Sequence, residues 1–118
     1  MAKQTIGQKG EQAAVAFLKN KGFRIVQTNY RVAGAEVDII ALSNGILCFV
    51  EVKTRSSGDF GAPEAFVHLA KQRKIIRAAK FFSARQAYRD CPVRFDVVSI
   101  IHDENGMACD HLENAFEE

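Results

Sequence analysis

The 118-residue chain lacks tryptophan, has only two prolines and carries three widely spaced cysteines without a C-x-x-C pair. This cysteine pattern argues against a disulfide framework and against a structural zinc site. The chain also lacks any run of 18 apolar residues, so we expect no transmembrane helix and a cytoplasmic protein with reduced thiols. Its net charge is only +2, so bulk charge does not indicate a nucleic-acid partner. Such a role must follow from where the charges are placed.

The composition is that of a globular protein, 47% hydrophobic and 25% charged, and predicts a single domain over residues 1–118. Hydrophobic periodicity predicts a helix, three strands, a second helix and a fourth strand, over about residues 6–20, 23–30, 35–42, 46–54, 64–87 and 93–101. We expect a loop over residues 55–63 and an acidic, weakly patterned tail over residues 102–118, outside a core of about residues 5–101. The order predicts an α/β or α+β fold with a central mixed sheet flanked by helices.

Two local signals support these boundaries. Thr5 and Gln8 have the spacing of a capping box at the start of the first helix. Asn44 and Gly45 form a strong hairpin signal between the second and third predicted strands. The hairpin would place these two strands side by side.

Charged residues interrupt both strands of this hairpin. Strict alternation would place Glu36, Asp38 and Ile40 on one face of the second strand. In the third strand, Glu51 and Lys53 would share a face and lie about 6–7 Å apart. Because the strands are neighbours, we expect Asp38 to lie near Glu51.

Charges on otherwise apolar strands need a partner, because an isolated buried carboxylate is costly. One interpretation is an internal ion pair between Lys53 and either acid. The other is a Mg²⁺ site, since this ion prefers a few carboxylate oxygens together with water and phosphate. Asp38, Glu51 and the adjacent Val52 carbonyl could then hold the metal, and Lys53 would position water or stabilise developing charge. Spacing alone leaves both interpretations open.

The first helix offers a further acid. Glu11 lies at the margin of the apolar stripe, so its carboxylate is expected to point towards the sheet. Gly7, Gly10 and Ala14 share one helical face, and glycine within a helix costs about 1 kcal/mol relative to alanine. This face therefore indicates close approach of another backbone or a ligand. The alternative is a tight helix–sheet contact with Glu11 merely solvated.

The second helix separates apolar from basic residues. Its predicted buried stripe contains Ile75, Ala78, Ala79 and Phe82, and a basic row lies opposite at Arg73, Arg77 and Lys80. Lys71 is nearly in line with the buried stripe, so it either extends to solvent or serves the site. Lys71, Arg31 and Arg55 are candidate contacts to a phosphate backbone.

An ordered series of motifs resembles the YraN-like family of bacterial proteins. The matching segments are Gly7-Gln8-Lys9-Gly10-Glu11, Asn29-Tyr30-Arg31, Glu36-Val37-Asp38-Ile39-Ile40-Ala41, Phe49-Val50-Glu51-Val52-Lys53-Thr54-Arg55, Phe60-Gly61, Lys71 and Arg94-Phe95-Asp96-Val97-Val98. That family is similar to the restriction-endonuclease-like PD-(D/E)xK superfamily, which includes archaeal Holliday-junction resolvases. The resemblance implies an αβββαβ core with Asp38 as the motif aspartate, Glu51 and Lys53 as the (D/E)xK pair, and Glu11 as the glutamate of the first helix. It favours the metal site over a simple ion pair.

These observations lead to two functional hypotheses. The first is a Mg²⁺- or Mn²⁺-dependent endonuclease that hydrolyses phosphodiester bonds in DNA, including branched or structured DNA. Asp38, Glu51 and Val52 would hold the metal, and Glu11, Asp38, Glu51 and Lys53 would form the catalytic set. The second is a non-catalytic nucleic-acid-binding module with the same fold. Cutting a junction would favour a homodimer, although no sequence feature demonstrates a dimer surface.

Overall fold

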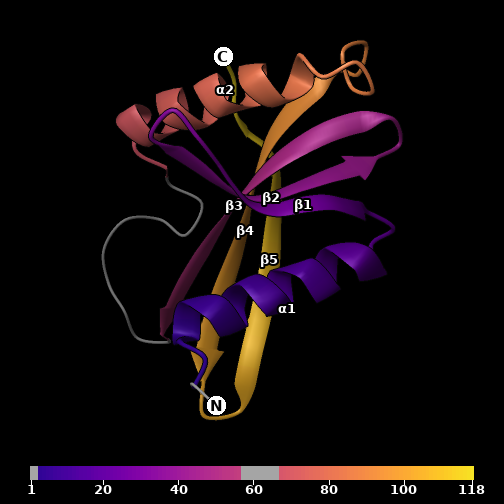
Figure 1. The fold of residues 1–118 in the computed structure, drawn as a ribbon. Helices are drawn as coiled ribbons and strands as arrows, with labels where there is room; N and C mark the ends of the chain where they lie inside the picture. The colour runs from indigo at the N-terminus through magenta and orange to yellow at the C-terminus, as the bar shows by residue number, and fades with distance from the viewer. Residues whose placement is uncertain (1–2, 57–66) are drawn as a thin grey trace.

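The computed structural model describes residues 3–56 and 67–118 as an α+β fold (Figure 1). Its elements are α1 (Ile6–Asn20), β1 (Arg24–Val32), β2 (Ala35–Ser43), β3 (Ile46–Ser56), α2 (Leu69–Ser83), β4 (Val93–Asp103) and β5 (Gly106–Phe116). The strands form one five-stranded sheet in the order β1-β2-β3-β4-β5. Among the strand pairs of the described residues, β3–β4 alone is parallel, so the sheet is mixed. The predicted fold class is therefore confirmed.

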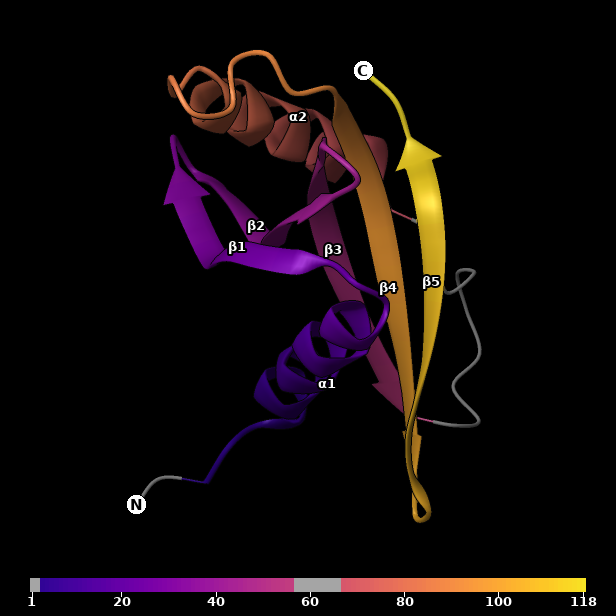
Figure 2. The same cartoon turned by 90° about the vertical axis from the view of Figure 1, so that its right-hand side faces the viewer.

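The two helices cover the sheet with separate apolar clusters. Ala14 and Leu18 of α1 pack against Ile39 and Val50. On the other side, α2 buries Ile75, Ala78, Ala79 and Phe82, as the sequence predicted. Figure 2 shows β4 and β5 running side by side, with β1 and β2 on the far side of β3 and turned away from their direction. Within the described ranges, neither helix has the length and apolar content needed to span a membrane.

Local chemistry explains the boundaries of α1 and of the hairpins. The Thr5 hydroxyl accepts the Gln8 backbone N–H at 3.0 Å, and the Gln8 side chain accepts the Thr5 N–H at 2.8 Å, so the capping box is confirmed. The β2–β3 hairpin turns at Asn44 and Gly45, with φ angles of 52° and 78°. Positive φ at both residues matches the right-handed twist of the flanking strands.

Three sequence boundaries need correction. Residues 106–116, expected in an acidic tail, form β5, an edge strand whose mostly exposed side chains hide the alternation. The second helix is shorter than predicted, because residues 67–68 are not helical and residues 84–87 form a turn, while residues 64–66 lie outside the described residues. The predicted loop began too early: residues 55–56 belong to β3, and residues 57–63 lie outside the described residues.

The face assignment of β2 is also wrong beyond Asp38. Val37 and Ile40 belong to the apolar cluster beneath α2, whereas Ile39 belongs to the cluster beneath α1. Strict alternation would put Val37 and Ile39 on the same face, so β2 changes face at Asp38. The cause is an interruption in the ladder: Asn29, which faces Asp38 in the β1–β2 register, has a φ of 52°.

Gly10 permits close packing of α1 on β3. A Cβ atom built at Gly10 would collide with the Thr54 side chain, whereas one at Gly7 would meet only the Thr5 hydroxyl oxygen at 3.8 Å. Gly10 therefore takes part in a tight helix–sheet contact, the alternative that the sequence left open, and Gly7 makes no close approach.

Gly10→Ala is expected to lower stability by about 1–3 kcal/mol, because α1 must shift away from Thr54. Gly7→Ala is the matched control and should be neutral or stabilising through helix propensity. Urea unfolding measures both effects. Thr54→Ala should restore part of the loss in the Gly10→Ala background, and equal stabilities of the two glycine variants would contradict this packing account.

Candidate functional site

The candidate site lies where β2 and β3 separate. Regular pairing between these strands ends at Ile39 and Val50, one residue before Asp38 and Glu51 would face each other. Asp38 fills the gap, because its Oδ2 accepts the Val52 backbone N–H at 2.8 Å. Glu51 follows Val50 and turns towards α2, where its side chain is only 3% exposed. The predicted proximity of Asp38 and Glu51 thus depends on the hairpin and on this local opening.

The two carboxyl groups strongly affect each other. Burial raises the pKa of Asp38, and a side-chain hydrogen bond with Glu51 and the charge of Glu51 raise it further, to about 7. The Val52 N–H and the charge of Lys71 oppose this rise in pKa. Two close carboxylates cannot both ionise cheaply without a cation. The pair therefore favours either a shared proton or a bound positive charge.

Lys71 supplies a positive charge from α2. Its Nζ lies 2.5 Å from Glu51 Oε2, and about half of the lysine side chain is exposed. Burial alone would lower the pKa of Lys71, but the hydrogen bond and charge of Glu51, together with the charges of Asp38 and Glu36, raise it. The ammonium is thus held in its charged form beside the acids.

Lys53 occupies a different position. It is half-buried on β3, two residues beyond Glu51, and pairs in register with Ser99 of β4. Among the described residues, no acid forms an ion pair with Lys53. The internal ion pair that spacing allowed therefore forms with Lys71 instead of Lys53. The spacing of residues along β3 could not indicate that Lys71 is the partner of Glu51. Lys71 belongs to α2, and the crossover from β3 to α2 brings it to the site.

A pocket of about 400 Å³ opens beside the acids. Its lining includes Asp38, Glu51 and Glu36, together with Lys71 and Lys74 of α2. Sequence reasoning missed Lys74, which is exposed and lies about one helical turn beyond Lys71. The pocket combines two buried or half-buried acids with two lysines. This arrangement can bind an oxygen-rich anion when a cation is held between the acids.

The remaining predicted residues do not line this pocket. Glu11 is half-buried, and its pKa is raised first by burial and then by the charges of Asp38 and Glu36, so it lies within electrostatic reach of the pair. Arg31 is exposed and lies 3.5 Å from Glu36. Arg55 is half-buried near the end of β3, and the Val52 N–H is bound to Asp38. Glu11 and Arg31 line neighbouring pockets.

The residues present fit a hard divalent cation only in part. Among the described residues, no group of three or more histidine, cysteine or acidic side chains is arranged to hold a metal. Two carboxylates with water and substrate phosphate are nevertheless an ordinary set of Mg²⁺ ligands. One oxygen of Glu11, Oε1, is also buried without a hydrogen-bond partner in the described part of the chain. The donor set suits an oxygen-preferring ion that also binds a substrate.

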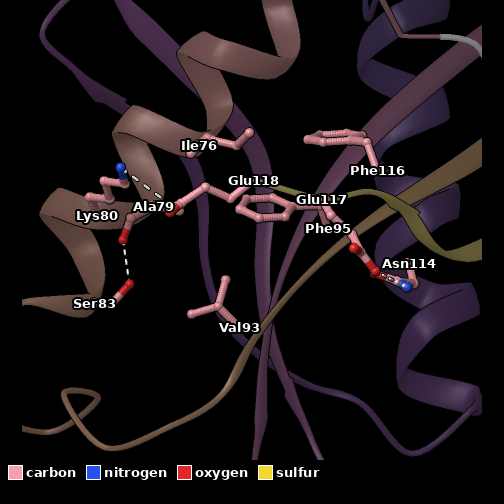
Figure 3. Close-up of a pocket in the computed structure, with 10 residues that line it drawn as sticks. All are labelled: Ile76, Ala79, Lys80, Ser83, Val93, Phe95, Asn114, Phe116, Glu117 and Glu118. Carbon is pink, nitrogen blue, oxygen red and sulfur yellow. Dashed lines mark hydrogen bonds and ion pairs between the residues drawn. The ribbon is translucent and has the colours of Figure 1, made fainter.

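Another pocket lies at the opposite end of α2. It has a volume of about 410 Å³ and an aromatic floor of Phe95 and Phe116, whose rings stack at 5.1 Å (Figure 3). Its rim carries an exposed ion pair of 3.4 Å between Lys80 and Glu118. None of the residues predicted from the sequence for the site lines this pocket. We therefore assign the candidate function to the pocket beside Asp38 and Glu51.

The five-stranded mixed sheet with its two flanking helices is consistent with a restriction-endonuclease-like αβββαβ core. The model of uncharacterised protein family UPF0102 matches residues 10–100. This chain belongs to that family. UPF0102 proteins of Desulforapulum autotrophicum and Alkaliphilus oremlandii are 46% and 48% identical, covering 98% and 94% of this chain and 95% and 97% of their own. The UPF0102 protein of Geobacter metallireducens is 41% identical, covering 97% of this chain and 93% of its own.

Proposed function

We propose that this protein is a Mg²⁺- or Mn²⁺-dependent endonuclease that hydrolyses phosphodiester bonds in DNA, including branched or structured DNA. The observation that carries the proposal is the acid pair of Asp38 and Glu51 beside Lys71 in an open pocket. Packing in the core does not require two interacting carboxyl groups at the wall of a pocket. A site that binds a cation and a phosphate does require such a pair.

Each residue has a distinct role in this proposal. Asp38, Glu51 and the Val52 carbonyl hold the metal, while the Val52 N–H fixes the orientation of Asp38. The metal, when bound, polarises the phosphate and makes a bound water more acidic. Lys53 orients the attacking water or stabilises negative charge on the phosphate. Glu11 lies within electrostatic reach of Asp38, and one oxygen of its carboxylate accepts a hydrogen bond from water at the edge of the site.

Cations around the pocket bind the DNA backbone. Arg31, Arg55 and Lys71 are the contacts predicted from the sequence, and Lys74 extends the same surface along α2. Phosphate contacts of this kind provide affinity with little sequence information. The proposal therefore implies binding that weakens steeply with salt.

A non-catalytic nucleic-acid-binding module is the second candidate. One contact favours it: the Lys71 ammonium already neutralises Glu51, so the buried acid does not require a metal for stability. In such a module the pocket would bind a phosphate through Lys71 and Lys74 without hydrolysis. DNA affinity would then be independent of Mg²⁺.

Cleavage assays on flaps, four-way junctions, single strands and RNA, with Mg²⁺ or Mn²⁺, separate the two candidates. We expect metal-dependent nicking of DNA, and a loss of about 10²–10³-fold in rate for Lys53→Ala with DNA binding preserved. Lys19→Ala, an exposed substitution on α1, is the matched control and should cleave normally. Normal cleavage by Lys53→Ala would rule out its assigned role, and binding without cleavage across the panel would favour the module.

A further inference from the structure

A separate pocket of about 350 Å³ lies between the start of α1 and β1. We call it the amide pocket, because four amide side chains line it, from Gln4, Gln8, Gln12 and Asn29, together with Glu11 and Val15. No lysine or arginine is among its lining residues in the described part of the chain. A phosphate would lack a counter-charge here and would lie against the Glu11 carboxyl group, so the pocket disfavours an anionic group.

The polar groups of the amide pocket specify what that ligand must offer. A free amide can both donate and accept hydrogen bonds, like the edge of a nucleobase. The Gln8 Oε1 already accepts the Thr5 N–H at 2.8 Å, and the Gln8 side-chain NH2 group can donate to a ligand. Glu11 Oε1 is buried without a hydrogen-bond partner among the described residues, so it requires a donor such as an amino group. Val15 adds an apolar surface.

Asn29 connects the amide pocket to the acid pair. It lies opposite Asp38, between the pairs Thr28–Ile39 and Tyr30–Val37, and has a φ of 52°. Such a backbone conformation inside a strand is strained for most residues and is concentrated at functional sites. Glu11 forms a second link, because it lines the amide pocket and interacts electrostatically with Asp38. Asn29 and Glu11 therefore bring the amide pocket close to Asp38 from the α1 side of the sheet.

We propose that the amide pocket binds an unpaired nucleobase of the DNA strand whose phosphate lies at Asp38 and Glu51. This inference rests on the proposed function and narrows its substrate class. A base must leave its stack to enter a pocket lined by side chains from a helix and a strand. The preferred DNA would therefore contain an unpaired nucleotide, as flaps, gaps and junctions do.

The test compares two duplexes that differ at one nucleotide, an extrahelical adenine or an abasic residue at the same position. Fluorescence anisotropy in Ca²⁺, with strand integrity checked on a denaturing gel, measures binding. We expect the protein to bind the adenine duplex about tenfold more tightly, as for a base held by side-chain hydrogen bonds. Asn29→Gly should bind both duplexes alike, because glycine keeps the positive φ but removes the amide.

Asn44→Gly is the matched control, since Asn44 has the same φ of 52° but lies at the β2–β3 turn outside the amide pocket. It should retain the tenfold preference. Gln12→Ala, on the exposed surface of α1, should lose it, and Gln86→Ala should keep it. Equal binding of the two duplexes by the wild-type protein would overturn the proposal that the amide pocket binds a base, and would leave the proposed function standing. Absence of binding to every DNA would overturn the proposed function as well.

Discussion

Asp96→Ala is expected to destabilise the protein by about 3–5 kcal/mol, the cost of removing one partner of a buried ion pair and leaving Arg94 without this counter-ion. The Asp96 side chain is fully buried in β4 and accepts hydrogen bonds from Arg94 Nε at 2.8 Å and Nη2 at 2.9 Å. It also accepts the Asn114 backbone N–H at 3.0 Å and lies 2.9 Å from His111 Nε2. Alanine would leave all these donors unpaired.

The His111 tautomer follows from its second neighbour. Lys21 Nζ lies 2.6 Å from His111 Nδ1, and an ammonium can only donate. Nδ1 must then accept, so Nε2 carries the hydrogen that Asp96 accepts. This chain of contacts ties the end of α1 to β4 and β5. Urea unfolding of Asp96→Ala measures how much these contacts contribute to the free energy of unfolding. Asp110→Ala removes an exposed acid on β5 and is the control, which should change stability by less than about 0.5 kcal/mol. Similar losses in both variants would contradict the account.

The same network predicts how stability depends on pH. Burial alone would raise the pKa of Asp96, but hydrogen bonds from His111, Arg94 and Asn114 outweigh it and lower the pKa. Because the unfolded value is about 3.9, the stabilisation is fully present above that pH. It is lost as the pH falls through the lower, folded pKa. The stability difference between wild type and Asp96→Asn should therefore shrink only in acid.

Asp38→Asn is expected to abolish metal binding and to raise stability by about 1 kcal/mol. Substitutions that remove an unfavourable interaction from a functional site often stabilise a protein by this amount. Asparagine keeps an oxygen for the Val52 N–H and removes the repulsion between Asp38 and Glu51. Thermal unfolding without metal measures the gain. Glu51→Gln is the comparison: it should also lose metal binding but gain less stability, because the ion pair with Lys71 is lost. A destabilised Asp38→Asn protein would contradict the repulsion argument.

Local signals in the sequence were sufficient for much of the fold. The capping box predicted the start of α1, and the Asn44–Gly45 turn predicted that β2 and β3 are adjacent strands. Because a hairpin sets its own register, the proximity of Asp38 and Glu51 could also be predicted. Their functional roles, and those of Glu11, Lys53, Arg31 and Arg55, stay predictions.

Features that depend on long-range contacts could not be predicted. The strand β5 has mainly exposed side chains at the sheet edge, so its alternation is weak. The change of face at Asp38 depends on the backbone conformation of Asn29, which residue types do not reveal. The Lys71–Glu51 pair and the Asp96–His111 contact join elements that only the crossover and the sheet order bring together.

Calorimetric titration of Mn²⁺ into the wild-type protein and into Asp38→Asn tests the central claim most directly. The acid pair predicts saturable binding of one or more ions to the wild type, with Mg²⁺ competing for the same ligands. Asp38→Asn should show no such binding while remaining folded by circular dichroism. Equal binding to both proteins, or none to the wild type, would contradict a metal site at Asp38 and Glu51.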